Sequence, residues 1–213
     1  MKKNNYTISV VICTYNRKKW VENLLVSLSK QNKKAEEIFI VDATKDTVDY
    51  VVPKTIDVNI IKSKKMQLTY QRNLGVNVSN GDIILHLDDD TYLRPDFIEN
   101  ILKVFIEDKK KRIGAVSGYV TNQWGIKKYK PGTTMKISKW LGIYDGDFLP
   151  GSVSHSGIFI ELNNLELQTG FCKTDFISGC SFAVRKEVYE KFNHPEHIKK
   201  YGGEDKAFSR MIA

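Results

Sequence analysis

Apolar residues in the first half of the chain form short continuous runs that alternate with segments of helical spacing. The runs are rich in β-branched residues and predict buried strands at residues 8–13, 38–41, 58–61 and 83–87. Apolar positions three and four residues apart predict helices at residues 18–31, 69–78 and 97–105. Strands alternating with helices in this way predict an α/β fold, a doubly wound and mostly parallel sheet with helices on both faces.

The second half has a less regular pattern. We expect a strand within residues 113–120, an extended segment at 176–185 broken at Gly179, and a short helix at 186–192. Residues 121–157 have no clear period, and we expect loops with short elements there. We expect one domain over residues 1–213. A last helix begins after Gly202 and Gly203 and reaches the chain end without a stop signal, which predicts that the natural protein continues.

Polar side chains follow the predicted strands where each strand ends, and open α/β sheets bind ligands at that edge. The residues are Thr14, Tyr15 and Arg17 after the first strand, Asp42 after the second, and Asp88, Asp89 and Asp90 after the fourth. Alternation in an extended chain predicts that Asp88 and Asp90 share one side and that Asp89 points to the other. The triplet is compatible with a divalent cation site and equally with solvated acids that lead into the next helix.

Composition and charge narrow the choice of function. The 213 residues are 41% hydrophobic and 27% charged, which is typical of a soluble globular protein. The net charge of +8 comes mostly from lysine clusters and is compatible with an anionic membrane surface or a phosphorylated substrate, while no nucleic-acid-binding motif is present. No apolar run has the roughly 18 residues of a membrane span and no signal peptide is recognisable, so we expect a cytoplasmic protein, with the inner face of the membrane as an option.

Two common classes of nucleotide-binding enzyme do not fit. No glycine-rich phosphate loop follows the first strand, which argues against a dehydrogenase or a nucleoside triphosphatase. The three cysteines have neither the even count of a disulfide framework nor the spacing of a zinc site.

Five segments resemble, in order, those of the family 2 glycosyltransferases, which have the GT-A fold. They are SVVICTYNR at 9–17, IFIVDAT at 38–44, QRNLGVNVSNGDIILHLDDD at 71–90, FISGCSFAVRKEVYEKF at 176–192 and GGED at 202–205. The resemblance implies transfer of a sugar, usually with inversion, from a nucleotide-diphosphate donor to a hydroxyl of a saccharide or lipid-linked saccharide. It also implies a nucleotide-sugar-binding half at 1–105 and an acceptor-binding half at 106–213.

The resemblance assigns the acidic triplet and two arginines to the donor phosphates. Asp90 matches the metal ligand of the family's Asp-x-Asp motif, with Mn²⁺ or Mg²⁺ as the cation. Asp88 and Asp89 would serve the ribose or the water shell of the metal. Arg72 is expected at the diphosphate, and Arg17 is a second candidate there.

The resemblance also implies a pocket for the nucleotide base. Asp42 matches the carboxylate that accepts a hydrogen bond from a pyrimidine N–H, and Thr14 and Tyr15 would line the same pocket. The family usually has an acid or amide where this chain has Ala43. The identity of the nucleotide base therefore stays open, with uridine as the leading choice. Asp42 is otherwise a turn or capping acid.

On the acceptor side, the resemblance implies a general base. Asp205 matches the base of the family's Glu-Asp motif, and Glu204 would orient the acceptor or share the role. Gly179 and Cys180 match the segment beneath the donor sugar, where a small residue lets backbone approach the ligand. Without the resemblance, both acids would simply favour the start of a helix.

Two other functions stay open at this point. A metal-dependent nucleotidyltransferase also acts on nucleotides, but it would need the missing phosphate loop. A non-catalytic module that binds a sugar nucleotide or a glycan is the second alternative. Family resemblance suggests a role in bacterial cell-surface polysaccharide or glycolipid synthesis, and the basic surface is compatible with peripheral association with an anionic membrane.

Overall fold

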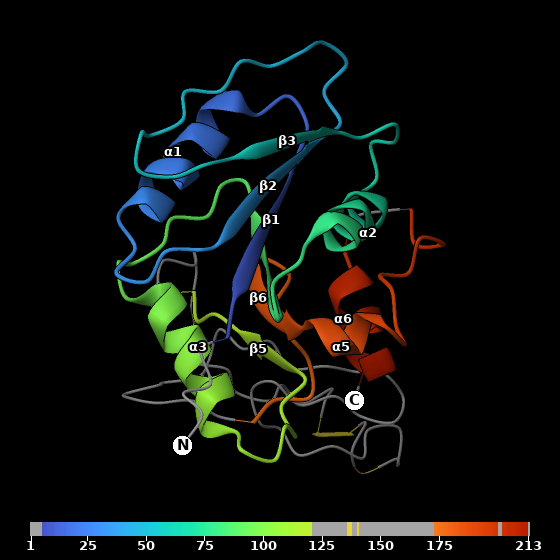
Figure 1. The fold of residues 1–213 in the computed structure, drawn as a ribbon. Helices are drawn as coiled ribbons and strands as arrows, with labels where there is room; N and C mark the ends of the chain where they lie inside the picture. Colours follow the sequence, from blue (N-terminus) through green and yellow to red (C-terminus); the bar gives the residue numbers. More distant parts are fainter. Residues whose placement is uncertain (1–5, 121–135, 138–139, 141–172, 200–201, 213) are drawn as a thin grey trace.

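The protein is built on one six-stranded sheet (Figure 1). The structure is a computed structural model that describes residues 6–120, 136–137, 140, 173–199 and 202–212, so the stretch predicted to be irregular at 121–157 lies almost entirely outside it. In spatial order the strands are β3 (Asn59–Lys62), β2 (Glu37–Asp42), β1 (Ile8–Thr14), β4 (Ile83–Asp88), β6 (Ser181–Arg185) and β5 (Ala115–Ser117). The first four strands of the chain are parallel, whereas β6 is antiparallel to both β4 and β5.

Helices cover both faces of the sheet, as predicted (Figure 1). One face carries α1 (Lys18–Ser29) and α3 (Phe97–Glu107), and the other carries α2 (Leu68–Val78), α5 (Lys186–Tyr189) and α6 (Glu204–Ile212). Each face of the sheet has its own hydrophobic core, and successive strand residues point into alternate cores. In β1, Val10 and Ile12 face α1, while Val11 faces α2. The doubly wound α/β architecture is therefore confirmed.

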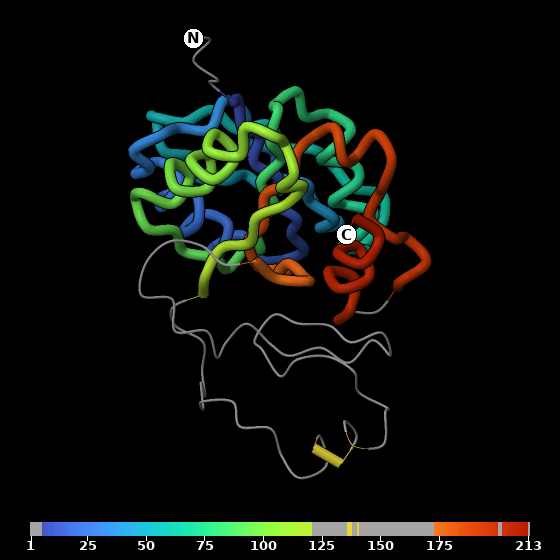
Figure 2. Tube along the Cα trace, turned by 90° about the horizontal axis from the view of Figure 1, so that it is seen from below, coloured from blue at the N-terminus to red at the C-terminus, as the bar shows by residue number. Residues whose placement is uncertain are grey.

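Three predicted elements of the second half are shorter than expected, among them the helix predicted at 186–192, which ends at Tyr189. The strand expected within 113–120 has only three residues, Ala115–Ser117. The extended segment at 176–185 becomes a strand only from Ser181, after a turn around Gly179. Figure 2 shows this segment beside α6, to which it is tied by a hydrogen bond from the Ile177 amide to Ser209 Oγ, 3.0 Å.

Strand register brings the polar strand ends to one edge of the sheet. Thr14 at the end of β1 is opposite Asp42 at the end of β2, and Cys13 is opposite Asp88 at the end of β4. α2 lies against these strands because Gly75 has no side chain where a Cβ atom would lie 2.3 Å from Val11 Cγ1. This close approach places the first turns of α2 above the same edge.

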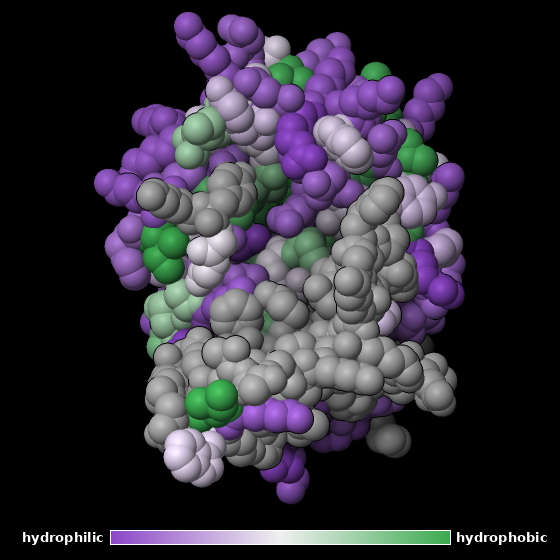
Figure 3. All heavy atoms as spheres, turned by 180° about the vertical axis from the view of Figure 1, so that it is seen from behind, coloured by the Kyte–Doolittle hydropathy of each residue, from purple (hydrophilic) through white to green (hydrophobic). Residues whose placement is uncertain are grey.

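The surface of the described residues is mostly hydrophilic on the face shown in Figure 3, with apolar side chains scattered over it. Within the described ranges, no helix combines the length and the apolar character needed to cross a membrane.

Candidate active site

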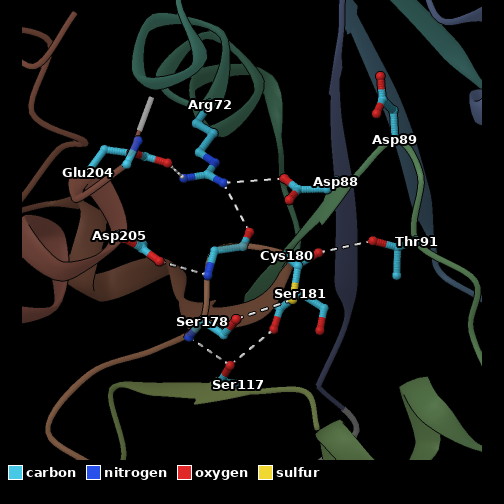
Figure 4. A network of polar contacts seen from close by, with 12 residues as sticks. Arg72, Asp88, Asp89, Thr91, Ser117, Ser178, Cys180, Ser181, Glu204 and Asp205 are labelled. Atoms are coloured by element: carbon cyan, nitrogen blue, oxygen red, sulfur yellow. Dashed lines mark hydrogen bonds and ion pairs between the residues drawn. The ribbon is translucent and has the colours of Figure 1, made fainter. Parts of the chain in front are cut away.

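The acidic triplet divides between two arginines at the end of β4. Arg17 contacts Asp89 through Nη1 and Asp90 through Nη2, each at 2.8 Å. Asp88 instead points toward Arg72, with Oδ1 3.6 Å from Nη2 (Figure 4). The expectation that Asp88 and Asp90 share one side is therefore wrong, because the strand ends at Asp88 and the chain then turns.

The three carboxylates differ in exposure. Asp89 is buried and accepts a hydrogen bond from Thr14 Oγ1 at 2.7 Å, whereas 46% of the Asp90 side chain is exposed. Burial raises the pKa of Asp88 to about 6; Arg72 opposes this shift, and the negative charges of Asp90 and Asp89 add to it. The strand end thus concentrates negative charge that a cation would relieve.

The donor groups fit a cation that takes most of its ligands from elsewhere. Among the described residues, no group of three or more His, Cys, Asp or Glu side chains is arranged to hold a metal ion. Mg²⁺ and similar hard cations commonly use one or two protein carboxylates, with phosphate oxygens and water completing the shell. The exposed carboxylate of Asp90, next to the negative charges of Asp88 and Asp89, suits a cation that is bound by few protein ligands.

Asp42 is buried and held in a fixed orientation. Its Oδ1 accepts a hydrogen bond from the Thr44 amide at 2.7 Å, and its Oδ2 accepts one from the Tyr50 hydroxyl at 3.0 Å. Burial and the Asp42 charge raise the pKa of Tyr50, so its hydroxyl stays a donor. Asp42 thus closes a turn, as the local alternative predicted, while it lies at the edge where a base would bind.

Sequence reasoning missed two residues that support this edge. Tyr50 lies in an aperiodic connection, where no pattern pointed to Asp42. Gln71 is buried in α2, and its Nε2 donates to the carbonyl oxygens of Thr14 and Val41 at 3.0 and 2.8 Å. The only sequence signal for Gln71 was a polar residue at a core-facing helix position. Tyr15 lies at the same strand end with 42% of its surface exposed.

The acidic pair at the start of α6 lies on the other side of Arg72. Gly202 and Gly203 both have positive φ, 95° and 99°, which favours glycine in the turn before the helix. Glu204 is 8% exposed, accepts the Gly202 amide hydrogen bond at 2.9 Å, and lies 3.9 Å from Arg72 Nη1. Asp205 is less buried and accepts the Gly179 amide at 3.1 Å and the Lys206 amide at 2.8 Å.

Residues 178–180 join the two acidic clusters (Figure 4). The Gly179 carbonyl accepts a hydrogen bond from Arg72 Nη2 at 3.0 Å, and the Cys180 carbonyl accepts the Asp88 amide at 3.0 Å. A Cβ atom on Gly179 would lie 3.2 Å from Asp205 Oδ2. The structure thus brings together Arg72, Asp88, Gly179, Cys180, Glu204 and Asp205, next to the second group formed by Thr14, Arg17, Asp89 and Asp90.

Comparison with known proteins gives the family of the chain. The sequence profile described as "Glycosyl transferase family 2" matches residues 9–192. The chain belongs to this family. A relative in Haemophilus influenzae, named an uncharacterized glycosyltransferase, is 35% identical over 99 residues, which are 46% of this chain and 34% of that protein. The family assignment and the sheet together confirm the expected GT-A fold.

Solved structures share the fold at low sequence identity. The mannosyltransferase PcManGT from Pyrobaculum calidifontis, in complex with GDP-Man and Mn²⁺, has a TM-score of 0.60 at 14% identity, covering 98% of this chain and 52% of that one. S. aureus TarS 1–349 in complex with UDP-GlcNAc has a TM-score of 0.56 at 17% identity, covering 97% and 53%. The chain spans about half the length of these two solved chains.

Proposed function

We propose that this family 2 chain is an inverting, metal-dependent glycosyltransferase that uses a nucleotide-diphosphate sugar, with UDP favoured. The observation that carries the proposal is the position of Asp205 across residues 178–180 from the acids at the end of β4. A single-displacement transfer needs a leaving-group site and a base on opposite sides of the sugar. The solved structures bound to UDP-GlcNAc and to GDP-Man support a nucleotide-sugar donor.

In this proposal, the strand-end edge holds the nucleotide. Asp42 accepts a hydrogen bond from an N–H of the nucleotide base, and Thr14 and Tyr15 lie beside that base. Arg17 contacts the diphosphate from the end of β1. Asp88 and Asp89 serve the ribose or the water shell of the metal. Asp90 would hold Mn²⁺ or Mg²⁺, which, when bound, offsets the charge that develops on the leaving diphosphate.

On the acceptor side, Asp205 takes the proton from the attacking hydroxyl. The acceptor oxygen bonds to the anomeric carbon as the bond from that carbon to the phosphate oxygen breaks, and its electron pair leaves with the diphosphate. Asp205 is better placed than Glu204 because Glu204 is buried and lies toward Arg72 and the Gly202 amide. Gly179 and Cys180 provide the backbone beneath the donor sugar, where a side chain at position 179 would crowd Asp205.

The acceptor and the cellular role are part of the same proposal. We propose a saccharide or lipid-linked saccharide acceptor in bacterial cell-surface polysaccharide or glycolipid synthesis, in the cytoplasm or at the inner face of the membrane. The +8 net charge supports attraction to an anionic membrane or to a phosphorylated lipid carrier.

A panel of nucleotide sugars tests the proposal. Each UDP- and GDP-sugar is incubated with the protein and Mn²⁺, with saccharide and lipid-linked acceptors, and the products are followed by mass spectrometry and by release of the nucleoside diphosphate. We expect transfer from one UDP-sugar, and loss of that transfer on chelation of the metal. Nucleotide transfer, or binding without turnover, would support the nucleotidyltransferase or the binding module instead.

A further inference from the structure

Arg72 is the one side chain in the described site that contacts both acidic clusters and the backbone between them. Its guanidinium lies 3.6 Å from Asp88 Oδ1, 3.9 Å from Glu204 Oε1 and 3.0 Å from the Gly179 carbonyl oxygen (Figure 4). The side chain is 3% exposed, and its Cζ atom lies over the Phe182 ring, 5.1 Å from the ring centroid. A guanidinium this buried, with protein groups facing Nη1 and Nη2 and an aromatic ring beside it, is poorly placed to bind a ligand directly.

The contacts continue from Arg72 to the proposed base. Arg72 holds the Gly179 carbonyl, and the amide of the same residue donates to Asp205 Oδ2 at 3.1 Å. Through Glu204, which precedes Asp205 in α6, Arg72 makes a second connection to the start of that helix. Movement of the guanidinium would therefore shift Asp205 from two directions.

The geometry of the guanidinium explains why this position needs arginine. Its planar fork aims different nitrogens at different partners, with Nη2 toward Asp88 and residue 179 and Nη1 toward Glu204. Within the described residues, Nη1 is a buried nitrogen without a hydrogen-bond partner, and the Glu204 carboxylate lies 3.9 Å from it. A lysine keeps the charge but reaches only a single point.

We propose that Arg72 is a positioning residue that holds the acceptor-side base, Asp205, in register with the end of β4, rather than a direct ligand of the donor diphosphate. This inference rests on the proposed function for the role of Asp205. It revises the expectation that Arg72 contacts the diphosphate and leaves that contact to Arg17. The consequence is that a change at Arg72 alters the rate of transfer more than the affinity for the donor.

The test is Arg72→Lys, measured by the kcat for transfer at saturating substrates and by the Kd of UDP with Mn²⁺ in calorimetry. Misplacing a reacting group by about 1 Å costs on the order of 100-fold in rate, so we expect a kcat loss of that size with the Kd changed by less than about threefold. A Kd weakened by about tenfold or more with kcat retained would show that Arg72 binds the diphosphate and would overturn the proposal. An unchanged kcat together with an unchanged Kd would overturn it as well.

A second variant covers the case in which the arginine change disturbs folding. Glu204→Gln keeps the size of the side chain and removes the charge that faces Arg72. We expect a smaller loss of kcat than in Arg72→Lys, again with a nearly unchanged Kd. Because the two residues act together, the double variant is expected to lose much less than the product of the two single losses. Independent, multiplicative losses would contradict the coupling.

A matched control and a readout that needs no activity separate this inference from the proposed function. Arg185 is also buried and pairs with Asp108 at 3.3 Å, but it lies opposite Ile83 at the far end of β4. Arg185→Lys is therefore expected to leave kcat unchanged. In Arg72→Lys, amide hydrogen exchange should rise at residues 179 and 202–206 and stay unchanged in β1. Unchanged exchange there would overturn the positioning role even if the wild-type protein transferred no sugar at all.

Discussion

At the scale of single residues, the three carboxylates at the end of β4 lie in different environments. Asp89 is buried between Thr14 and Arg17. Asp88 keeps 39% of its side chain exposed and faces Arg72, whereas Asp90 keeps 46% exposed with one oxygen 2.8 Å from Arg17. A buried carboxylate whose oxygens accept internal hydrogen bonds has few lone pairs left for a cation. Asp89 is therefore poorly placed to meet a metal, and Asp90 is the more exposed of the other two carboxylates.

Asp90→Asn tests this placement. The amide removes the negative charge while keeping the shape, so we expect the gain in UDP affinity that Mn²⁺ provides to fall by about 10-fold or more. Calorimetry with and without Mn²⁺ measures the difference. Asp57→Asn, at an exposed position in another part of the chain, is the control and should leave the Mn²⁺-dependent gain in UDP affinity unchanged. A metal-dependent gain that survives in Asp90→Asn would reject the assignment.

The sequence predicted the residues of the site better than it predicted their contacts. The strand-end acids and the acids at the start of α6 follow from local pattern and family resemblance, because each lies next to a recognisable element boundary. The hydrogen bonds of Tyr50 to Asp42 and of Gln71 to Thr14 join segments 8 and 57 residues apart. Contacts of this kind depend on tertiary packing, which no local pattern encodes.

At the scale of elements, the close packing of α2 on the sheet places Gln71 and Arg72 over the strand ends. The helix approaches β1 at Gly75, where the position of Val11 leaves no room for a side chain. Glycine is otherwise costly inside a helix, by about 1 kcal/mol relative to alanine. The packing requirement outweighs helix propensity at this position.

Gly75→Ala should therefore lower the free energy of unfolding. An overpacking cost of about 1–3 kcal/mol offsets the gain of about 1 kcal/mol in helix propensity. Urea unfolding measures the change. Asn77→Ala, an exposed position in the same helix, is the control and should be neutral or slightly stabilising. The double variant with Val11→Ala should be less destabilised than the sum of the single changes; strict additivity would contradict a clash at this contact.

Periodicity predicted most elements but gave neither strand direction nor length in the second half. The run of apolar residues in β6 has the same character as that in β4, yet the two strands are antiparallel. Hydrophobic pattern repeats every two residues in either direction, so it carries no information on chain direction. The turn that precedes β6 also carries the backbone contacts of the site.

At the scale of the whole molecule, the two cores on either side of the sheet differ in polarity. The core beneath α2, α5 and α6 contains His86 and His194, whose Nε2 atoms lie 2.7 and 3.2 Å from the Tyr189 hydroxyl. The Nδ1 atoms of both histidines have no hydrogen-bond partner among the described residues. Burial lowers the pKa of each histidine well below its ordinary value, so both are neutral in the folded protein.

Stability should therefore fall as the solution is acidified below about pH 6.5. The unfolded chain gains protons on both histidines there while the folded protein does not, which lowers the free energy of unfolding by up to about 1.4 kcal/mol per pH unit for each histidine. The raised pKa of Asp88, about 6, acts in the opposite direction as the pH falls further toward its ordinary value near ~4. Because 39% of the Asp88 side chain is exposed and its charge is partly screened by water, Asp88 offsets only part of the contribution of one histidine below pH 6.

Urea unfolding between pH 8 and pH 5.5 measures this dependence. We expect the pH dependence to fall by at least about half in His86→Leu, which removes one of the two buried histidines while Asp88 still opposes the other. It should be retained in His197→Gln, an exposed control. Stability independent of pH across this range would contradict two neutral buried histidines.

The central claim is that Asp205 removes the proton from the acceptor while the end of β4 binds the donor, and the kinetics of Asp205→Asn test it most directly. We predict that transfer falls about 10²–10⁴-fold because the amide cannot accept the proton. The affinity for the nucleotide-sugar donor, measured by calorimetry with Mn²⁺ on the same preparation, should stay within about twofold of the wild-type value. Full transfer activity in Asp205→Asn would contradict the claim and shift the base to another residue, with Glu204 as the next to test.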